Sequence, residues 1–149
     1  MELSPLVIFV YNRLKHLRET IEALKSNYYA TETLLYIFSD GPKNDNDKYR
    51  VAHVREYIKK IDGFKNLEII SQEENIGLAN SVINGVAKVI EQHGRVIALE
   101  DDIVSSPYYL SYMNKALNYY INHRNVFSIT GFNHSPMTMK IPKHYKHDV

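Results

Sequence analysis

Hydrophobic residues along this chain alternate between short continuous runs and longer stretches in which they recur every three or four positions. The continuous runs are rich in β-branched residues and predict buried strands. The periodic stretches predict amphipathic helices that bury one face. The expected strands span residues 6–10, 34–38, 67–70, 96–99 and 126–129, and the apolar positions of the expected helices run from 14 to 24, 51 to 61, 79 to 90 and 110 to 121.

A helix separates each expected strand from the next. This order is typical of βαβ units, so the predicted fold class is α/β, with a mostly parallel sheet flanked by helices. The length of 149 residues fits one domain, to which we assign residues 1–134. Residues 135–149 contain two prolines and no apolar period, and we expect this tail to lead into an acceptor-binding region beyond Val149.

Several residues mark where the expected helices begin or end. Asp47 is a candidate cap for the second helix, and Gly94 is expected to end the third. Before the fourth helix, Ser106 is a candidate N-cap followed by Pro107 at the first helical position.

Composition and charge exclude several classes of protein. The apolar fraction of 44% and charged fraction of 23% are those of an ordinary globular protein. A net charge of +1 gives no support for a nucleic-acid partner. The absence of cysteine excludes disulfides, thiolate zinc sites and a cysteine nucleophile. Because we find neither a signal peptide nor the roughly eighteen apolar residues of a membrane span, we expect a cytoplasmic protein, with peripheral membrane association left open.

The acidic triplet Glu100, Asp101 and Asp102 directly follows the fourth expected strand. Open α/β sheets bind ligands at the carboxyl ends of their strands, and adjacent carboxylates repel one another unless a cation or donors lie near. Mg²⁺ is often held by one or two carboxylates together with substrate phosphates. The triplet therefore predicts a metal site for a nucleotide diphosphate. The alternative is a helix cap or a solvated loop, which the competing start signals Ser106 and Pro107 weaken.

Other polar residues follow the remaining strands. Asp40 is either a turn residue or an acceptor for the imide N–H of uracil. Arg13 is either a solvated residue at a helix start or a phosphate contact; its planar guanidinium suits phosphate oxygens, and a cation there opposes the helix dipole. Asn75 and Gly77 precede the third helix, where backbone N–H groups either bind a ligand or form a plain turn.

Other familiar sites receive no support. No glycine-rich GxGxxG segment follows the first strand, and no Walker-type GxxxxGK segment is present. His134, His144 and His147 lie in or beside the basic tail, and we interpret them as solvated residues rather than as metal ligands.

The order of these strand ends resembles the nucleotide-binding half of a GT-A glycosyltransferase. The segments Tyr-Asn-Arg at 11–13, Ser-Asp-Gly at 39–41 and Glu-Asp-Asp at 100–102 carry the resemblance, together with Pro-Tyr-Tyr at 107–109. More narrowly, residues 6–133 resemble the N-acetylglucosaminyltransferase I family and its bacterial relatives, whose DxD motif has a Glu-Asp-Asp variant. A departure from the broad family-2 transferases is that Val82 and Ile83 stand where those enzymes usually carry Arg-Asn.

The resemblance implies a glycosyltransferase of the hexosyl or N-acetylhexosaminyl class, with a role in polysaccharide biosynthesis. Its donor would be a nucleoside-diphosphate sugar, for which we expect a UDP-sugar, and its acceptor a carbohydrate or glycoconjugate. The resemblance implies that Asp102 binds Mn²⁺ or Mg²⁺ and that Asp101 accepts a hydrogen bond from a ribose hydroxyl. It also implies that Asp40 contacts uracil and Arg13 a phosphate. The complete set of expected nucleotide contacts is Tyr11, Arg13, Asp40, Asn75, Gly77, Glu100 and Asp101.

The catalytic base is not assigned, because in such enzymes it lies well downstream of the acidic motif, which places it beyond Val149 here. Two alternatives stay open. One is a nucleotide-binding module that catalyses nothing, and the other is a nucleotidyltransferase with a similar sheet. The second has less support because no glycine-rich, basic loop follows the first strand.

Overall fold

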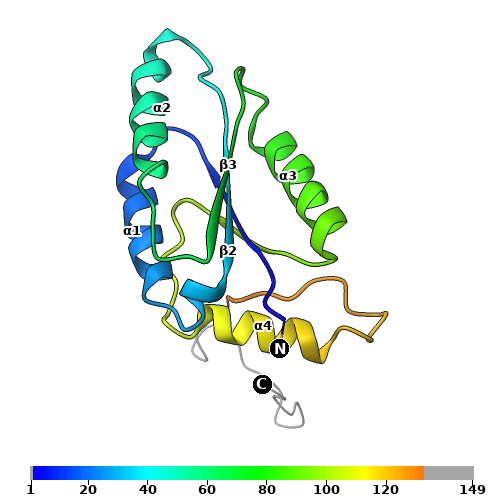
Figure 1. The fold of residues 1–149 in the computed structure, drawn as a ribbon. Helices are drawn as coiled ribbons and strands as arrows, with labels where there is room; N and C mark the ends of the chain where they lie inside the picture. The colour runs from blue at the N-terminus through cyan, green and yellow to red at the C-terminus, as the bar shows by residue number, and fades with distance from the viewer. Residues whose placement is uncertain (1, 133–149) are drawn as a thin grey trace, which may run out of the picture.

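The computed structural model describes residues 2–132, drawn in colour in Figure 1. Four strands in this part of the chain form one parallel sheet in the order β3-β2-β1-β4. The strands are β1 (Leu6–Val10), β2 (Leu34–Ser39), β3 (Asn66–Ser71) and β4 (Ile97–Glu100). The helices are α1 (Leu14–Lys25), α2 (Asp45–Ile58), α3 (Leu78–His93) and α4 (Tyr109–Tyr119), with a 3₁₀ turn, η1 (Ala30–Glu32), before β2.

The predicted α/β fold with a parallel sheet is confirmed. Helices α1 and α2 cover one face of the sheet and α3 covers the other (Figure 1). Because all four strands are parallel, their carboxyl ends lie at the same edge of the sheet. That edge is where ligands bind in open α/β sheets.

The central strand β1 separates two apolar cores. Leu6, Ile8 and Val10 pack with residues of α1 and α2, whereas Val7 and Phe9 belong to the core on the α3 side. All five residues of β1 are buried. A continuous apolar run is the sequence signature of such a strand, which is why the pattern located β1 to the residue.

The buried face of α3 matches the predicted one only in part. Of the predicted apolar positions Ala79, Val82, Ile83, Val86 and Ile90, only Val82 and Val86 pack against the core on this side of the sheet. Ser81 and Gly85 lie against the sheet, whereas Ile83 is 64% exposed and Ile90 is also exposed. The small residues allow the helix to approach the aromatic rings of the sheet, since a Cβ atom at Gly85 would lie 2.7 Å from Cε1 of Phe9. Close contact with the sheet therefore selects small residues here, and hydrophobic periodicity does not reveal them.

The expected strand over residues 126–129 is absent from the structure. These residues form no strand, and Phe127 is fully exposed. An apolar run forms a strand only with a hydrogen-bonding partner. Here the segment instead lines a cavity of about 900 Å³ beside β4 and α4.

Two predicted helix starts are also corrected. The cap of α2 is Asn44, whose side chain accepts a hydrogen bond from the N–H of Asp47 at 3.2 Å, so Asp47 lies inside the first turn. Helix α4 begins at Tyr109, two residues later than Pro107. The hydroxyl of Ser106 accepts from the N–H of Tyr108 at 3.1 Å and so closes the turn that precedes the helix.

The interpretation of His134, His144 and His147 as solvated concerns residues outside the described part of the chain. Over residues 2–132, no helix combines the length and the apolar character needed to cross a membrane.

Candidate functional site

A cavity of about 440 Å³ lies where β1, β2 and β4 end. Its size is in the range of small-molecule and cofactor sites. All seven residues predicted to contact a nucleotide line it, and they come from four separate segments of the chain. These residues are Tyr11, Arg13, Asp40, Asn75, Gly77, Glu100 and Asp101.

One side of the cavity is apolar. Phe9 and Phe38 contribute to its lining and stack on each other, with ring centroids 5.5 Å apart. Leu78 and Ser81, from the first turn of α3, complete this side. A flat heterocycle is the kind of group that such an aromatic surface accepts.

The lining also contains charged residues, among them Arg13, which contacts two aspartates: Asp101, which lines the cavity, and Asp102, which does not. Nη2 of Arg13 forms an ion pair with Oδ1 of Asp101, and Nη1 donates to Oδ2 of Asp102 at 3.0 Å. The side chain of Asp101 is only 4% exposed, whereas those of Asp102 and Arg13 are 37% and 45% exposed. Glu100 lines the same cavity from the last position of β4.

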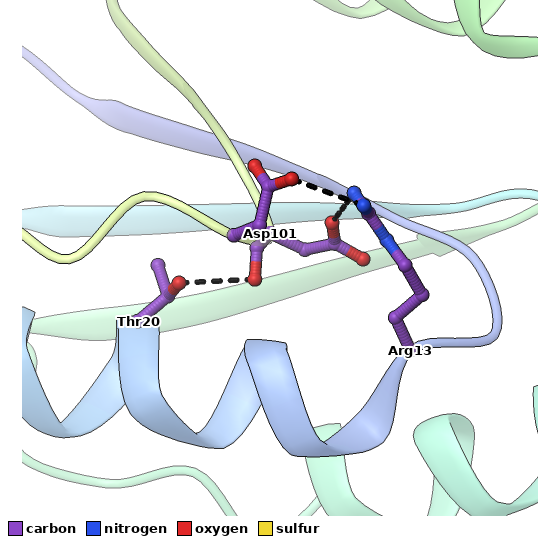
Figure 2. Close-up of polar contacts among 4 residues, drawn as sticks. Arg13, Thr20 and Asp101 are labelled. Atoms are coloured by element: carbon purple, nitrogen blue, oxygen red, sulfur yellow. Dashed lines mark hydrogen bonds and ion pairs between the residues drawn. The ribbon is translucent and has the colours of Figure 1, made fainter.

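The main chain of the acidic segment is anchored to α1. The buried hydroxyl of Thr20 donates to the carbonyl oxygen of Asp101 at 3.0 Å. Figure 2 shows Thr20 and Arg13 approaching Asp101 from the same helix region. Helix α1 therefore fixes the position of Asp101 through its main chain and neutralises its carboxylate through Arg13.

Burial raises the pKa of Asp101 above its ordinary value, because removal from water disfavours the charged carboxylate more than the Arg13 guanidinium favours it. The pKa of Arg13 is itself raised, chiefly by its hydrogen bond to Asp101. The buried carboxyl of Asp101 is therefore stabilised in its charged form mainly by the partly exposed guanidinium of Arg13.

We expect Arg13→Met to raise the pKa of Asp101 further. A carboxyl whose pKa is higher in the folded than in the unfolded protein binds more protons when folded between those two values, so unfolding free energy falls as pH rises through that interval. The unfolding free energy of the parent should fall with rising pH relative to that of Asp101→Asn, which lacks the carboxyl. The same comparison made in Arg13→Met should show the fall extending to higher pH. NMR titration of the Asp101 carboxyl, with denaturant unfolding at each pH, measures both effects. An unchanged or lower pKa in Arg13→Met would contradict the argument.

Asp40 fastens the loop that precedes α3. Its Oδ1 accepts from the N–H groups of Gly41 and Ile76, both at 2.9 Å, and its Oδ2 accepts from Asn75 Nδ2 and the Gly77 N–H, both at 3.0 Å. A carboxylate offers about four acceptor positions, and these bonds use that number. Contact between Asp40 and uracil therefore stays a prediction that requires one of these bonds to be exchanged.

The same bonds explain the role of the Asn75–Gly77 loop. The N–H groups of Ile76 and Gly77 donate to Asp40, so they are already used within the protein. Of the two predicted roles, a structural turn therefore fits these groups better than ligand binding. Gly77 has a φ of 80°, a backbone conformation that favours glycine. At Gly41, a Cβ atom would lie 2.4 Å from the carbonyl carbon of Glu74, so the two loops approach too closely for a side chain.

Asp47, predicted only as a helix cap, orders the loop after β1. Its two oxygens accept from the Tyr11 hydroxyl and from Asn12 Nδ2, both at 2.9 Å. The Tyr11 hydroxyl in turn accepts from the N–H of Lys43 at 3.0 Å. Asp47 therefore supports the Tyr-Asn segment from the neighbouring helix.

Arg55 is a second supporting residue that the sequence did not indicate. Its Nε donates to Ser39 Oγ at 3.2 Å, and its Nη2 donates to the carbonyls of Asp40 at 3.3 Å and Gln72 at 2.5 Å. It thereby ties together the carboxyl ends of β2 and β3. A clue was its position within the apolar face of α2, between Val54 and Ile58.

The donor set at Asp102 is compatible with a divalent cation. Within residues 2–132, no three His, Cys, Asp or Glu side chains form a cluster that could hold a metal ion by themselves. Asp102 is partly exposed, and only its Oδ2 is engaged by a donor from the described residues. Mg²⁺ and Mn²⁺ prefer oxygen ligands, and substrate phosphates often supply part of the shell. The residues therefore fit a cation whose coordination a diphosphate completes.

Comparison with known proteins identifies the type of fold. A family model described as glycosyl transferase family 2 matches residues 6–146. The crystal structure of S. aureus TarS matches with a TM-score of 0.56 and 14% identity, over 80% of this chain and 20% of that one. The crystal structure of S. aureus TarS 1-349 matches with a TM-score of 0.56 and 17% identity, over 80% of this chain and 33% of that one.

This chain thus spans a fifth to a third of the length of those two structures, and at such identities the likeness shows the fold alone. No curated protein matches the sequence. The fold is the Rossmann-like α/β fold of the GT-A type, as predicted.

Proposed function

Because the chain belongs to glycosyl transferase family 2, we propose that its cavity at the ends of β1, β2 and β4 binds a nucleoside-diphosphate sugar, whose sugar is transferred to a carbohydrate or glycoconjugate acceptor. The observation that carries the proposal is the convergence of all seven expected nucleotide contacts on one cavity of suitable size.

The two sides of the cavity suit the two ends of a nucleotide. The base would lie against the surface formed by Phe9, Phe38 and Leu78, close to Asp40. The diphosphate would lie on the side of Arg13 and Asp102, and Asp101 would accept a hydrogen bond from the ribose. We propose that the donor is a UDP-sugar and that the enzyme is of the hexosyl or N-acetylhexosaminyl class. We also propose the narrower relationship to the N-acetylglucosaminyltransferase I family.

Asp102 would hold Mn²⁺ or Mg²⁺ together with phosphate oxygens. When bound there, such an ion would supply Lewis-acid stabilisation of the charge on a departing diphosphate, typically worth several kcal/mol. Arg13 carries a permanent positive charge and would contribute to the same stabilisation. Thr20 keeps the acidic segment in place by its bond to the carbonyl of Asp101.

Calorimetry with UDP and Mn²⁺ tests the proposal. Asp102→Asn should bind UDP in the presence of Mn²⁺ at least about tenfold more weakly than the parent, which corresponds to about 1.4 kcal/mol, because a neutral amide is a poor ligand for a hard cation. The matched control is Asp62→Asn, at an exposed residue paired with Lys25, which should bind as the parent does. Equal affinity of Asp102→Asn and the parent would count against the assignment.

The activity assay separates the remaining alternatives. Transfer of a sugar by the 149-residue chain would exclude a module that only binds the nucleotide. Release of pyrophosphate from a nucleoside triphosphate would favour a nucleotidyltransferase instead.

A further inference from the structure

Arg13 lies between the carboxylates of Asp101 and Asp102 and neutralises their charge. A divalent cation bound at Asp102 would neutralise the same charge. Each terminal nitrogen of its guanidinium contacts a different aspartate, Nη2 that of Asp101 and Nη1 that of Asp102. A cation that binds Asp102 would therefore lie close to the guanidinium of Arg13, and the two positive charges would oppose each other even though only Oδ2 is engaged.

We infer that Arg13 couples metal binding to diphosphate binding: it holds Asp101 and Asp102 as their counter-ion, and it gives up Asp102 to the metal when a diphosphate offers the guanidinium new acceptors. This inference rests on the proposed function of the cavity. It adds a role for Arg13 beyond that of a phosphate contact.

The two partners of the ion pair differ in their freedom to move. Asp101 is buried, and its main chain is fixed by Thr20. The Arg13 side chain is 45% exposed, already lines the cavity and stands immediately before α1, so it can change partners without a change in the helix. The exchange thus requires movement of one side chain only.

The local field favours departure of the guanidinium once another acceptor is present. Arg13 lies at the N-terminus of α1, where the helix dipole disfavours a cation, and the described first turn of α1 contains no acidic residue to offset it. The two aspartates therefore supply the compensation that keeps Arg13 in place. Phosphate oxygens can replace them, because a guanidinium binds phosphate with two parallel hydrogen bonds.

The coupling has a definite sign. Metal alone gains Asp102 but either lies beside the positive charge of Arg13 or displaces it, so it binds weakly. Metal with diphosphate breaks the Arg13–Asp102 pair while Arg13 acquires a new partner, so each ligand strengthens the binding of the other. Coupling free energies are reciprocal, so UDP should improve Mn²⁺ affinity by the same factor by which Mn²⁺ improves UDP affinity.

Mn²⁺ binding to the 149-residue chain, followed by electron paramagnetic resonance with and without UDP, tests the inference. Arg13→Met should bind Mn²⁺ alone roughly tenfold more tightly than the parent, and the factor by which UDP improves Mn²⁺ affinity should fall roughly tenfold, in the range of ordinary coupling energies. The matched control is Arg18→Met, on the same helix, where the guanidinium lies over the ring of Tyr57 at 5.3 Å from its centroid. Arg18→Met should reproduce the parent in both measurements.

The outcomes separate this inference from the proposed function. If the parent binds UDP with Mn²⁺ and Arg13→Met binds Mn²⁺ alone no more tightly than the parent, the coupling role of Arg13 is wrong and the proposed function stands. If the parent binds neither UDP nor Mn²⁺, the proposed function is wrong and the inference with it. Should Arg13→Met fail to fold, Arg13→Gln removes the same charge and gives the same readout. Arg13→Lys, which keeps a positive charge, should retain part of the coupling.

Discussion

Asp40→Ala should lower the free energy of unfolding by about 3–5 kcal/mol, because it removes the acceptor of four hydrogen bonds at a residue that is 6% exposed. An unsatisfied buried donor costs about 1–3 kcal/mol, and water would reach some of the four after substitution. The loop 75–77 would lose its attachment to the end of β2. Since that loop lines the cavity, affinity for UDP should fall together with stability.

Denaturant unfolding measures the change in stability, and two further variants calibrate it. Asp40→Asn keeps the shape of the side chain but retains one carbonyl oxygen, so its loss should lie between those of the parent and the alanine variant. Asp45→Ala removes an exposed carboxylate that pairs with Lys48 in the first turn of α2, and it should lower stability by no more than about 1 kcal/mol. A change for Asp40→Ala as small as that for Asp45→Ala would show that the four bonds contribute little.

Ile8→Ala should lower the free energy of unfolding by about 2–5 kcal/mol, the usual cost of a large cavity in a packed core. Ile8 is completely buried at the centre of β1, and β1 pairs with both β2 and β4. The other buried residues of its core belong to five other elements, so the site has little freedom to collapse after truncation.

Ile83→Ala is the matched control for this variant. The residue type and the atoms removed are the same, but Ile83 lies on the exposed side of α3. Its replacement should change stability by less than about 0.5 kcal/mol, as for most surface positions. Equal losses for the two variants, measured by denaturant unfolding, would mean that α3 buries the face carrying Ile83 after all.

The accuracy of the predicted elements follows the way each one is buried. All four described strands are located within one residue at each end. For β1 and β2 the reason is that strands covered on both faces have continuous apolar sequences, whereas β4 is buried on alternate residues only. The segment 126–129 has the same sequence character but lacks a paired neighbour, and pairing is a property of the whole fold. The predicted face of α3 was correct at Val82 and Val86 but wrong at Ile83 and Ile90. Ser81 and Gly85, which lie against the sheet, are selected by close contact there, which periodicity does not report.

The site shows the same division between local and tertiary information. Parallel strands place their carboxyl ends together, so the predicted strand boundaries were enough to predict that Arg13, Asp40 and Asp101 lie at one cavity. The partners of these residues could not be inferred in the same way. Asp40 and Arg55 bond largely to main-chain groups of distant loops, and peptide groups carry no sequence signal.

The bonds made by Arg55 have a consequence for how the cavity responds to acid. Its acceptors at the ends of β2 and β3 are peptide carbonyls and one serine hydroxyl, none of which takes up a proton near neutral or mildly acidic pH, and a guanidinium stays charged throughout. The end of β2, which borders the cavity at Phe38 and Asp40, should therefore keep its position while Asp101 becomes protonated. Acidification would therefore weaken binding beside Asp101 and leave the part of the cavity at the end of β2 unchanged.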